Sequence, residues 1–257
     1  MAISNVVQRG SSHLSILTRV AACAVLGVVC VPHSIPRAAA EDRPAWTSTW
    51  TASPQPLLPA EDGLDPGVPS SLADQTVRQI VRVSVGGRAV RVVISNAYGK
   101  APLVIGEARI ARPAGGANLV QGSDRPLTFG GEPGVTIPPG APAISDPVEL
   151  DVPALSDLAV SVYVPGFTPL DTFHWTGQQT GYLAAGNVTA AVNLTPSATF
   201  SARLFISSVL TATHRPAPVV AGFGDSITDG SSATLDSNQR WPDLLAQRLA
   251  PYRIAAI

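Results

Sequence analysis

The amino-acid sequence predicts a mainly β protein: an antiparallel β-sandwich over residues 41–212, followed by the first strand and helix of an α/β unit over residues 213–257. Short runs of strand character recur in the first part, and proline and glycine separate them roughly every eight to twelve residues. No segment between residues 46 and 212 has the apolar periodicity of a helix. After residue 218, by contrast, a strand, a helix and the start of a strand follow one another, which is typical of an α/β unit.

The composition is that of a globular protein without a strongly charged surface. Of the 257 residues, 45% are hydrophobic and 14% are charged, and the formal net charge is −1. This length suffices for one large or two ordinary domains with their own cores. No block of basic residues stands out, so the sequence gives no support for a nucleic-acid partner.

Residues 1–40 are predicted to be a signal peptide. Arg9 and Arg19 supply positive charge, Val20 to Val31 is apolar, and Ala38-Ala39-Ala40 offers a cleavage site before Glu41. A retained membrane anchor is the alternative, but the apolar run is short for a bilayer span. We therefore expect a secreted or periplasmic protein with no stable membrane span after cleavage.

Both cysteines, Cys23 and Cys30, lie inside the predicted signal peptide. The order Val20-Ala21-Ala22-Cys23 resembles a lipoprotein signal, yet this cysteine precedes the apolar run instead of closing it. The exported chain is therefore expected to contain no disulfide, no thiol nucleophile and no cysteine-based metal site. We expect no cofactor and no metal.

The clearest strand pair is predicted in the first third of the chain. Trp46 to Ala52 has the aromatic and threonine content of a strand, and residues 53–74 are expected to form a loop. Two strands, Gln75 to Val85 and Arg88 to Asn96, are then expected to form a β-hairpin. Gly86-Gly87 joins them and supplies the positive φ angles that a two-residue turn needs. In the second strand, Val90, Val92 and Ile94 alternate with the residues between them, as expected for a strand with one buried face.

Further strands are expected along the rest of the sandwich. In the run Leu158 to Val164, apolar residues alternate and are expected to share one buried face. The other predicted strands are Leu103 to Ala111, Leu127 to Phe129, Val135 to Ile137, Val148 to Val152, Tyr182 to Ala184 and Arg203 to Leu210.

A proline-rich linker, residues 213–218, leads into the α/β part. Val219 to Phe223 is predicted to be a strand that a parallel sheet buries on both faces. Trp241 to Ala250 is predicted to be a helix, with Pro242 in its first turn and Trp241, Leu244, Leu245 and Leu249 on one face. Pro251 ends this helix, and another apolar run begins at Arg253.

The Gly-Asp-Ser turn after Val219 to Phe223 is the candidate chemical site. A serine at the exit of a strand is held rigidly while its Oγ stays exposed, which suits a nucleophile. Known glycine-rich motifs do not fit: Ile227 replaces the third glycine of a dinucleotide fingerprint, and no Gly-Lys-Ser/Thr follows. Thr228 replaces the glycine that a nucleophile elbow carries two residues after its serine.

The stretch Gly224-Asp225-Ser226-Ile227-Thr228-Asp229-Gly230 resembles the first block of the SGNH, or GDSL, hydrolases. The resemblance covers essentially the whole chain after residue 40, because a secreted bacterial branch of this family also carries an N-terminal β-domain. The other matching segments are Asn238, Arg240 to Leu245, Arg248-Leu249, Trp50 to Gln55, Gln75 to Gln79 and Ile94 to Gly99.

The resemblance implies a flavodoxin-like α/β domain that hydrolyses esters through an acyl-enzyme. It makes Ser226 the nucleophile and the Ser226 backbone N–H one oxyanion donor. Gly224 and Asp225 are assigned an oxyanion or turn-shaping role. From their residue type alone, Asp225 and Asp229 are expected to shape the turn and cap nearby N–H groups. The implied substrate is a small acyl ester, a lipid ester or an acetylated carbohydrate. In the family the remaining oxyanion donors, a glycine and an asparagine, and an Asp-x-x-His base follow the serine.

The later blocks that would supply that glycine, that asparagine and the Asp-x-x-His pair have no counterpart in the sequence up to Ile257. We therefore expect the chain to be a C-terminally truncated SGNH/GDSL hydrolase with little activity, whether the truncation is biological or an error in the reading frame. Residues 213–257 are expected to be poorly ordered unless they pack on the sandwich.

Several residues have a simpler structural interpretation. Asp171 and His174 have the Asp-x-x-His spacing but precede the serine, so we interpret the spacing as coincidence, and His214 as a solvated linker residue. The tryptophans of the β-domain are expected to be packed in the interior instead of lining a sugar site. The competing functional hypothesis is a non-catalytic β-sandwich that binds carbohydrate or a partner and carries a vestigial hydrolase tail.

Overall fold

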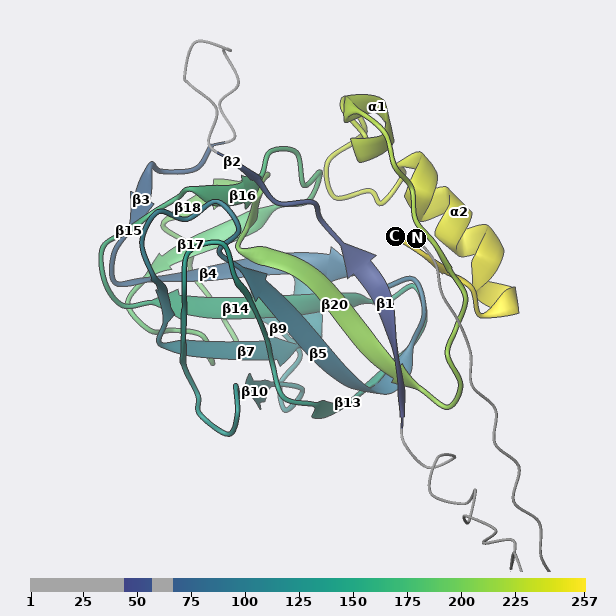
Figure 1. Ribbon diagram of the computed structural model, residues 1–257, viewed down its shortest axis with the longest axis horizontal. Helices are drawn as coiled ribbons and strands as arrows, with labels where there is room; N and C mark the ends of the chain where they lie inside the picture. Colours follow the sequence, from purple (N-terminus) through teal and green to yellow (C-terminus); the bar gives the residue numbers. More distant parts are fainter. Residues whose placement is uncertain (1–43, 57–66) are drawn as a thin grey trace, which may run out of the picture. The chain divides into compact units, whose positions relative to one another are not determined.

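The computed structural model describes residues 44–56 and 67–257, so the predicted signal peptide and both cysteines lie outside the described residues. Residues 43–257 form one compact unit. The fold is mainly β, as predicted, and its large sheets are antiparallel (Figure 1). Within the described ranges, no helix is both long and apolar enough to span a bilayer.

The first large sheet has five strands in the order β1-β20-β5-β12, with β13 also paired to β5. Val90, Val92 and Ile94 of β5 are fully buried, which confirms the predicted alternation. The bounds are β1 Ala45–Thr51, β20 Ile206–Thr213, β5 Gly87–Ser95, β12 Pro142–Ile144 and β13 Val148–Val152.

The second large sheet has six strands in the order β10-β7-β14-β4-β17-β18. The predicted face of β14, Leu158 to Val164, enters one hydrophobic cluster together with the buried residues of β5, so side chains of both large sheets make the core. The bounds are β10 Arg125–Leu127, β7 Glu107–Ala111, β14 Asp157–Val164, β4 Gln75–Arg82, β17 Gly181–Ala185 and β18 Ala198–Phe200.

Short strands form smaller sheets around these two. Two predicted strands are each divided, one at Gly106 into β6 and β7, and one at Phe205, whose φ is 63°, into β19 and β20. The small antiparallel sheets are β11 (Val135–Ile137) with β6 (Leu103–Ile105), β15 (Thr168–Pro169) with β3 (Ser71–Leu72), β8 (Pro113–Gly115) with β9 (Asn118–Leu119), and β19 (Arg203–Leu204), β16 (Thr172–His174) and β2 (Gln55–Pro56).

The predicted β-hairpin over residues 75–96 is wrong, because β4 and β5 belong to different sheets. The backbone N–H of Ser84 donates to Thr49 O of β1, and the N–H of Val85 donates to Thr49 Oγ1, so the connection passes from one sheet to the other. Neither Gly86 nor Gly87 has a positive φ. They are small because backbone crowds them: a Cβ on Gly86 would lie 2.2 Å from Val152 O.

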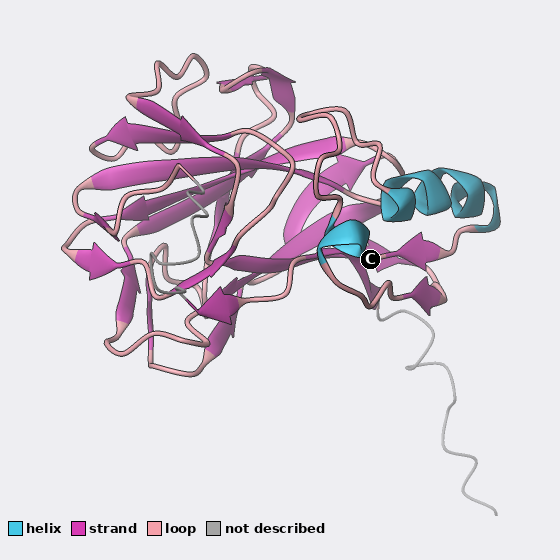
Figure 2. Ribbon diagram, turned by 90° about the horizontal axis from the view of Figure 1, so that it is seen from above, coloured by secondary structure: helices cyan, strands magenta, loops and turns pink. Residues whose placement is uncertain are grey.

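The C-terminal elements follow the predicted order of strand, helix and strand. The short strands β21 (Val219–Val220) and β22 (Ala255–Ala256) pair in parallel. Between them lie α1 (Ser226–Asp229), α2 (Trp241–Leu249) and the 3₁₀-helix η3 (Ala250–Tyr252). Figure 2 shows α1 as a single helical turn and α2 as the longer helix, both coloured cyan. Pro242 lies in the first turn of α2, as predicted.

The burial on both faces predicted for the strand Val219 to Phe223 is wrong. Val219 and Val220 are each 42% exposed and Phe223 is fully exposed, because β22 is the only strand that pairs with β21 in the described chain. In α2, Trp241 and Leu244 are likewise exposed, and the buried residue is Ala246.

Residues 213–257 pack on the β-domain. Such packing is the circumstance in which these residues are expected to be ordered. The backbone N–H of Ala217 donates to Thr47 Oγ1 of β1 at 3.2 Å. The backbone N–H of Asp236 donates to Gln178 O, and the Asp236 carboxylate accepts from Thr180. Polar contacts thus join the C-terminal part to the segment that follows β16.

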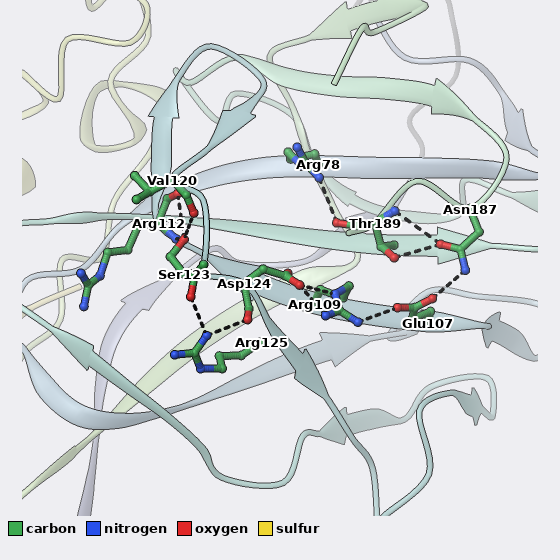
Figure 3. A network of polar contacts seen from close by, with 11 residues as sticks. Arg78, Glu107, Arg109, Arg112, Val120, Ser123, Asp124, Arg125, Asn187 and Thr189 are labelled. Carbon is green, nitrogen blue, oxygen red and sulfur yellow. Dashed lines mark hydrogen bonds and ion pairs between the residues drawn. The ribbon is translucent and has the colours of Figure 1, made fainter. Parts of the chain in front are cut away.

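A polar network crosses the six-stranded sheet on the flank that carries β7 (Figure 3). Arg78 of β4 donates to Thr189 O at 2.9 Å, and Thr189 Oγ1 donates to Asn187 Oδ1. Asn187 donates to Glu107, which pairs with Arg109 at 3.0 Å. Although burial opposes it, these hydrogen bonds lower the pKa of Glu107 below its usual value. The network fixes the loop around residue 188 on the sheet.

Candidate active site

Ser226 is the first residue of α1, a single helical turn whose ends the sequence specifies. The Asp225 side chain accepts from the backbone N–H of Ile227 at 3.0 Å and caps the helix, which is the turn-shaping role predicted for it. Gly230 ends the helix with φ 88°, a conformation that favours glycine. A Cβ on Gly224 would lie 2.1 Å from Thr228 Oγ1, so this position also needs a glycine.

The Ser226 side chain is exposed and free to react. Among the described residues, no hydrogen bond engages its Oγ or its backbone N–H, whereas its carbonyl accepts from Ser231 N at 2.7 Å. A hydroxyl beside an unpaired N–H is the pair of groups that acyl transfer uses for attack and for oxyanion stabilisation. The turn therefore presents both groups to solvent.

Ser226 lines a cleft of about 610 Å³ that both parts of the chain enclose. The C-terminal part contributes the turn from Gly222 to Ser226, and the β-domain contributes Trp50, Gln55 and His174. A cavity of this volume fits a small organic ligand. The β-domain thus forms part of the wall that faces the candidate nucleophile.

Asp229, three residues after Ser226, is held by residues of the β-domain. Its Oδ1 lies 2.8 Å from His174 Nε2, and its Oδ2 accepts a short hydrogen bond from Thr176 Oγ1. Burial would raise the pKa of Asp229, but the hydrogen bonds and the nearby positive charges outweigh it, so the pKa is lowered from the usual value. Asp229 therefore binds across to the β-domain, and the predicted turn-shaping role is not the one its side chain plays.

Neither described histidine hydrogen-bonds Ser226. His174 contacts Asp229 and Ser53 O, while the Asp171 carboxylate accepts from Lys100 N at 3.4 Å. The Asp171-x-x-His174 spacing thus forms no dyad, which supports its interpretation as coincidence. His214 is exposed in the linker.

Arg203 is a buried cation in the wall of the cleft. It is 3% exposed and donates to Ile80 O at 2.5 Å and to Gly177 O at 3.0 Å, with the Trp50 ring centroid 5.4 Å from Cζ. Burial is the main reason that its pKa is lowered to about 9. Its hydrogen bonds to backbone carbonyls make it a support for the loop around Gly177.

The tryptophans of the β-domain are engaged in packing. Trp46 lies under Arg91 at 4.8 Å, Trp50 lies under Arg203, and Trp175 packs on Phe173 with ring centroids 4.9 Å apart. Trp50 is 6% exposed, as the packing interpretation predicts. These contacts do not favour a stacking platform for sugars.

Comparison of the chain with protein-family models and with curated proteins finds no match. In the described ranges, no group of three or more His, Cys, Asp or Glu residues is placed to hold a metal ion.

Sequence reasoning identified Ser226 and Asp225 but missed the contact between His174 and Asp229. These two residues are 55 positions apart, and neither has a local pattern that pairs it with the other. They meet only in the folded chain, where a hydrogen bond joins α1 to β16.

Proposed function

We propose that the protein is an exported serine ester hydrolase of the SGNH/GDSL type with Ser226 as its nucleophile. The observation that carries the proposal is the unpaired Ser226 hydroxyl and N–H at the start of α1, inside a cleft of about 610 Å³. The substrate class is a small acyl ester, a lipid ester or an acetylated carbohydrate.

In the same proposal, the two large antiparallel sheets are the layers of a β-sandwich, and β21 to β22 is the first unit of a flavodoxin-like SGNH domain. The shared hydrophobic core of the sheets supports the first part. The parallel pairing of β21 with β22, with helices in the connection, supports the second, because parallel neighbours in α/β sheets are joined in this way.

Ser226 Oγ attacks the ester carbonyl carbon, a base takes the hydroxyl proton, and the carbonyl oxygen becomes an oxyanion beside the Ser226 N–H. Collapse of this tetrahedral intermediate expels the alcohol, which takes up the proton from the base, and leaves the acyl group on Ser226. Water then attacks the acyl-enzyme with help from the same base, and the second intermediate releases the acid and restores the Ser226 hydroxyl. Neither described histidine is placed for this proton transfer. His174 is hydrogen-bonded to Ser53 and Asp229, and His214 is exposed in the linker. We therefore propose that the base and further oxyanion donors come from a segment beyond residue 257.

The test joins gene sequencing to an ester assay. The reading frame downstream of the Ile257 codon is sequenced, and the 257-residue chain and the longest encoded product are assayed with p-nitrophenyl acetate. We expect near-background turnover by the 257-residue chain, a downstream Asp-x-x-His, and turnover by the longer product. Ser226→Ala should lower that turnover by at least about 1000-fold.

Ser231→Ala is the matched control, because Ser231 is an exposed serine of the same turn that lines the same cleft. It should leave turnover within about twofold of the unchanged protein. Ester turnover that survives Ser226→Ala, or a reading frame that supplies no histidine after the serine, would exclude the proposed mechanism.

A further inference from the structure

The segment from His174 to Thr180, here called the docking strip, holds the C-terminal part at two points, the last residue of α1 and the loop between α1 and α2. His174 and Thr176 bind Asp229 of α1. Thr180 donates to the Asp236 carboxylate from both its backbone N–H and its hydroxyl, each at 2.6 Å. The strip is itself anchored, because Gly177 donates to Ser201 O and accepts from Arg203.

Hydrophobic packing does not hold α1 in place. The helix has four residues, none of them buried, and the Ile227 side chain is 75% exposed. A single turn of helix is unstable on its own, because few backbone hydrogen bonds offset the ordering of its residues. Polar contacts with the docking strip therefore hold α1 in place. Asp229 is the residue of α1 that makes these contacts.

Both ring nitrogens of His174 face oxygen atoms that only accept hydrogen bonds. Nδ1 lies 2.9 Å from Ser53 O, and Nε2 lies 2.8 Å from Asp229 Oδ1. A carbonyl has no hydrogen to donate, and neither has an ionised carboxylate. The two contacts are satisfied together only when both nitrogens carry hydrogens, so the geometry selects the imidazolium form.

The charged groups around His174 come from three elements. Asp229 lies on α1, Arg203 lies opposite His174 in the register of β19 with β16, and Arg240, which precedes α2, acts electrostatically on Asp229. The guanidinium of Arg240 is paired with Asp243, and that of Arg203 is bonded to backbone carbonyls. Asp229 is thus the carboxylate left to balance the imidazolium.

We infer that His174 is a positioning residue for Ser226: as an imidazolium clamped between Ser53 O and Asp229, it fixes α1 against β16 and so sets where the serine lies in the cleft. The role toward a nucleophile rests on the proposed function, whereas the clamp stands on the contacts alone. Asp229 follows Ser226 by three residues, close to one helical turn, so holding one side chain orients the other.

The first test is spectroscopic and needs no ester hydrolysis. Nitrogen-15 NMR of the imidazole rings at pH 8 reports whether each nitrogen carries a hydrogen, at a pH where a histidine with the ordinary pKa of about 6.5 carries only one. For the His174 ring in the wild-type protein we expect hydrogens on both nitrogens, and this doubly protonated signal should be lost in Asp229→Asn, which removes the carboxylate charge. A single-hydrogen tautomer of His174 at pH 8 in the wild-type protein would overturn the inference.

The second test measures amide hydrogen exchange at Asp229, Gly230 and Ser231, whose N–H groups bond within the turn. His174→Gln keeps a polar side chain of similar size but removes the charge, and it should speed exchange at these amides about tenfold. His214→Gln is the matched control, since His214 is the exposed histidine of the linker, and it should change nothing. Equal exchange in both variants would refute the clamp.

The pH dependence of this exchange has a defined sign. Because the pKa of Asp229 is lowered in the fold, its ionised form stabilises the contact above its ordinary pKa of about 3.9, and that contribution is lost as the pH falls through the lowered value. After correction for intrinsic exchange, protection in the wild-type protein should therefore fall at low pH to the level of Asp229→Asn.

The two proposals fail in different ways. Absence of the doubly protonated signal from the wild-type protein, with Ser226-dependent turnover intact, would remove the clamp and leave the hydrolase. Absent turnover with an intact clamp would remove the hydrolase and leave a docked turn without chemistry.

Discussion

Arg78 is a buried cation without a carboxylate partner within ion-pair distance among the described residues. Hydrogen bonds to backbone carbonyls stabilise it instead. Its side chain is fully buried and donates to the carbonyls of Ala117, Thr189 and Ala191 and to Ser161 Oγ. Burial is the main reason that its pKa is lowered to about 10. The guanidinium stays charged at neutral pH and joins two loops to β4.

We predict that Arg78→Met lowers the free energy of unfolding by about 2 to 4 kcal/mol, because three backbone carbonyls lose their donor, two of them in buried contacts. Urea unfolding followed by tryptophan fluorescence measures the change. Arg125→Met is the control: this exposed arginine also donates to backbone carbonyls, and its loss should cost less than about 0.5 kcal/mol. Equal effects in the two variants would contradict the role of burial.

At the residue scale, local chemistry made some positions predictable and left others hidden. Asp225 was assigned to shaping the turn because Asp at a turn caps the next N–H groups, a rule that needs only neighbours. Arg78 gave no signal, since an arginine in a strand is usually solvated. His174 was considered only for its spacing to Asp171, whereas its partner in the fold is Asp229.

At the scale of elements, the connection from β4 to β5 depends on a glycine that backbone surrounds. A Cβ on Gly86 would lie 2.2 Å from Val152 O and 2.7 Å from Ala154 N, and neither atom belongs to a side chain that can turn away. We predict that Gly86→Ala lowers the free energy of unfolding by about 1 to 3 kcal/mol through overpacking. Thermal unfolding measures it.

Gly166 provides the matched control for this prediction. A Cβ there meets no atom within 4 Å, and its φ lies outside the left-handed region. Gly166→Ala should therefore leave the melting temperature unchanged or slightly higher. A similar loss of stability in both variants would show that crowding at Gly86 is not the cause.

The same connection explains why the predicted hairpin was wrong. Two glycines between strand-like runs match the pattern of a two-residue turn, and that pattern is local. The choice between pairing within a sheet and crossing to the other sheet depends on Thr49, which takes the hydrogen bonds of Ser84 and Val85. A partner some 35 positions away leaves no trace in the hairpin sequence.

At the scale of the whole molecule, the C-terminal part leaves apolar side chains uncovered. Phe223 is fully exposed, Ile227 is 75% exposed, and Val219 and Val220 lie on a two-stranded sheet. Exposed apolar groups beside open strand edges favour self-association. We predict that Phe223→Ser lowers the light scattering of concentrated samples without lowering the unfolding midpoint.

Phe167→Ser is the comparison for that measurement. Phe167 is an exposed phenylalanine like Phe223, with 75% of its surface accessible, but it lies in a loop of the β-domain. Its replacement should leave scattering unchanged. If both variants reduce scattering equally, general surface hydrophobicity is responsible, and the open edge at β21 is not.

The fold class was predictable because it depends on periodicity and on spacing along the chain. Alternation in β5 and β14 predicted their buried faces, and the order of strand, helix and strand predicted the parallel pair of β21 and β22. The sheet assignments were not predictable, since β1 pairs with β20 from the far end of the domain. The burial of β21 was overestimated because an apolar run indicates only that a segment tends to be buried. It does not show whether strands on both sides are present to bury it.

The pairing of β1 with β20 also sets an order of events during synthesis. Ala45 and Thr213, which lie opposite each other in these strands, are 168 positions apart. Contacts of such separation close late, because the chain between their ends must be ordered first. The five-stranded sheet is therefore completed only when Thr213 has left the ribosome, and the serine turn, which emerges after Thr213, meets a docking strip whose sheets are already forming.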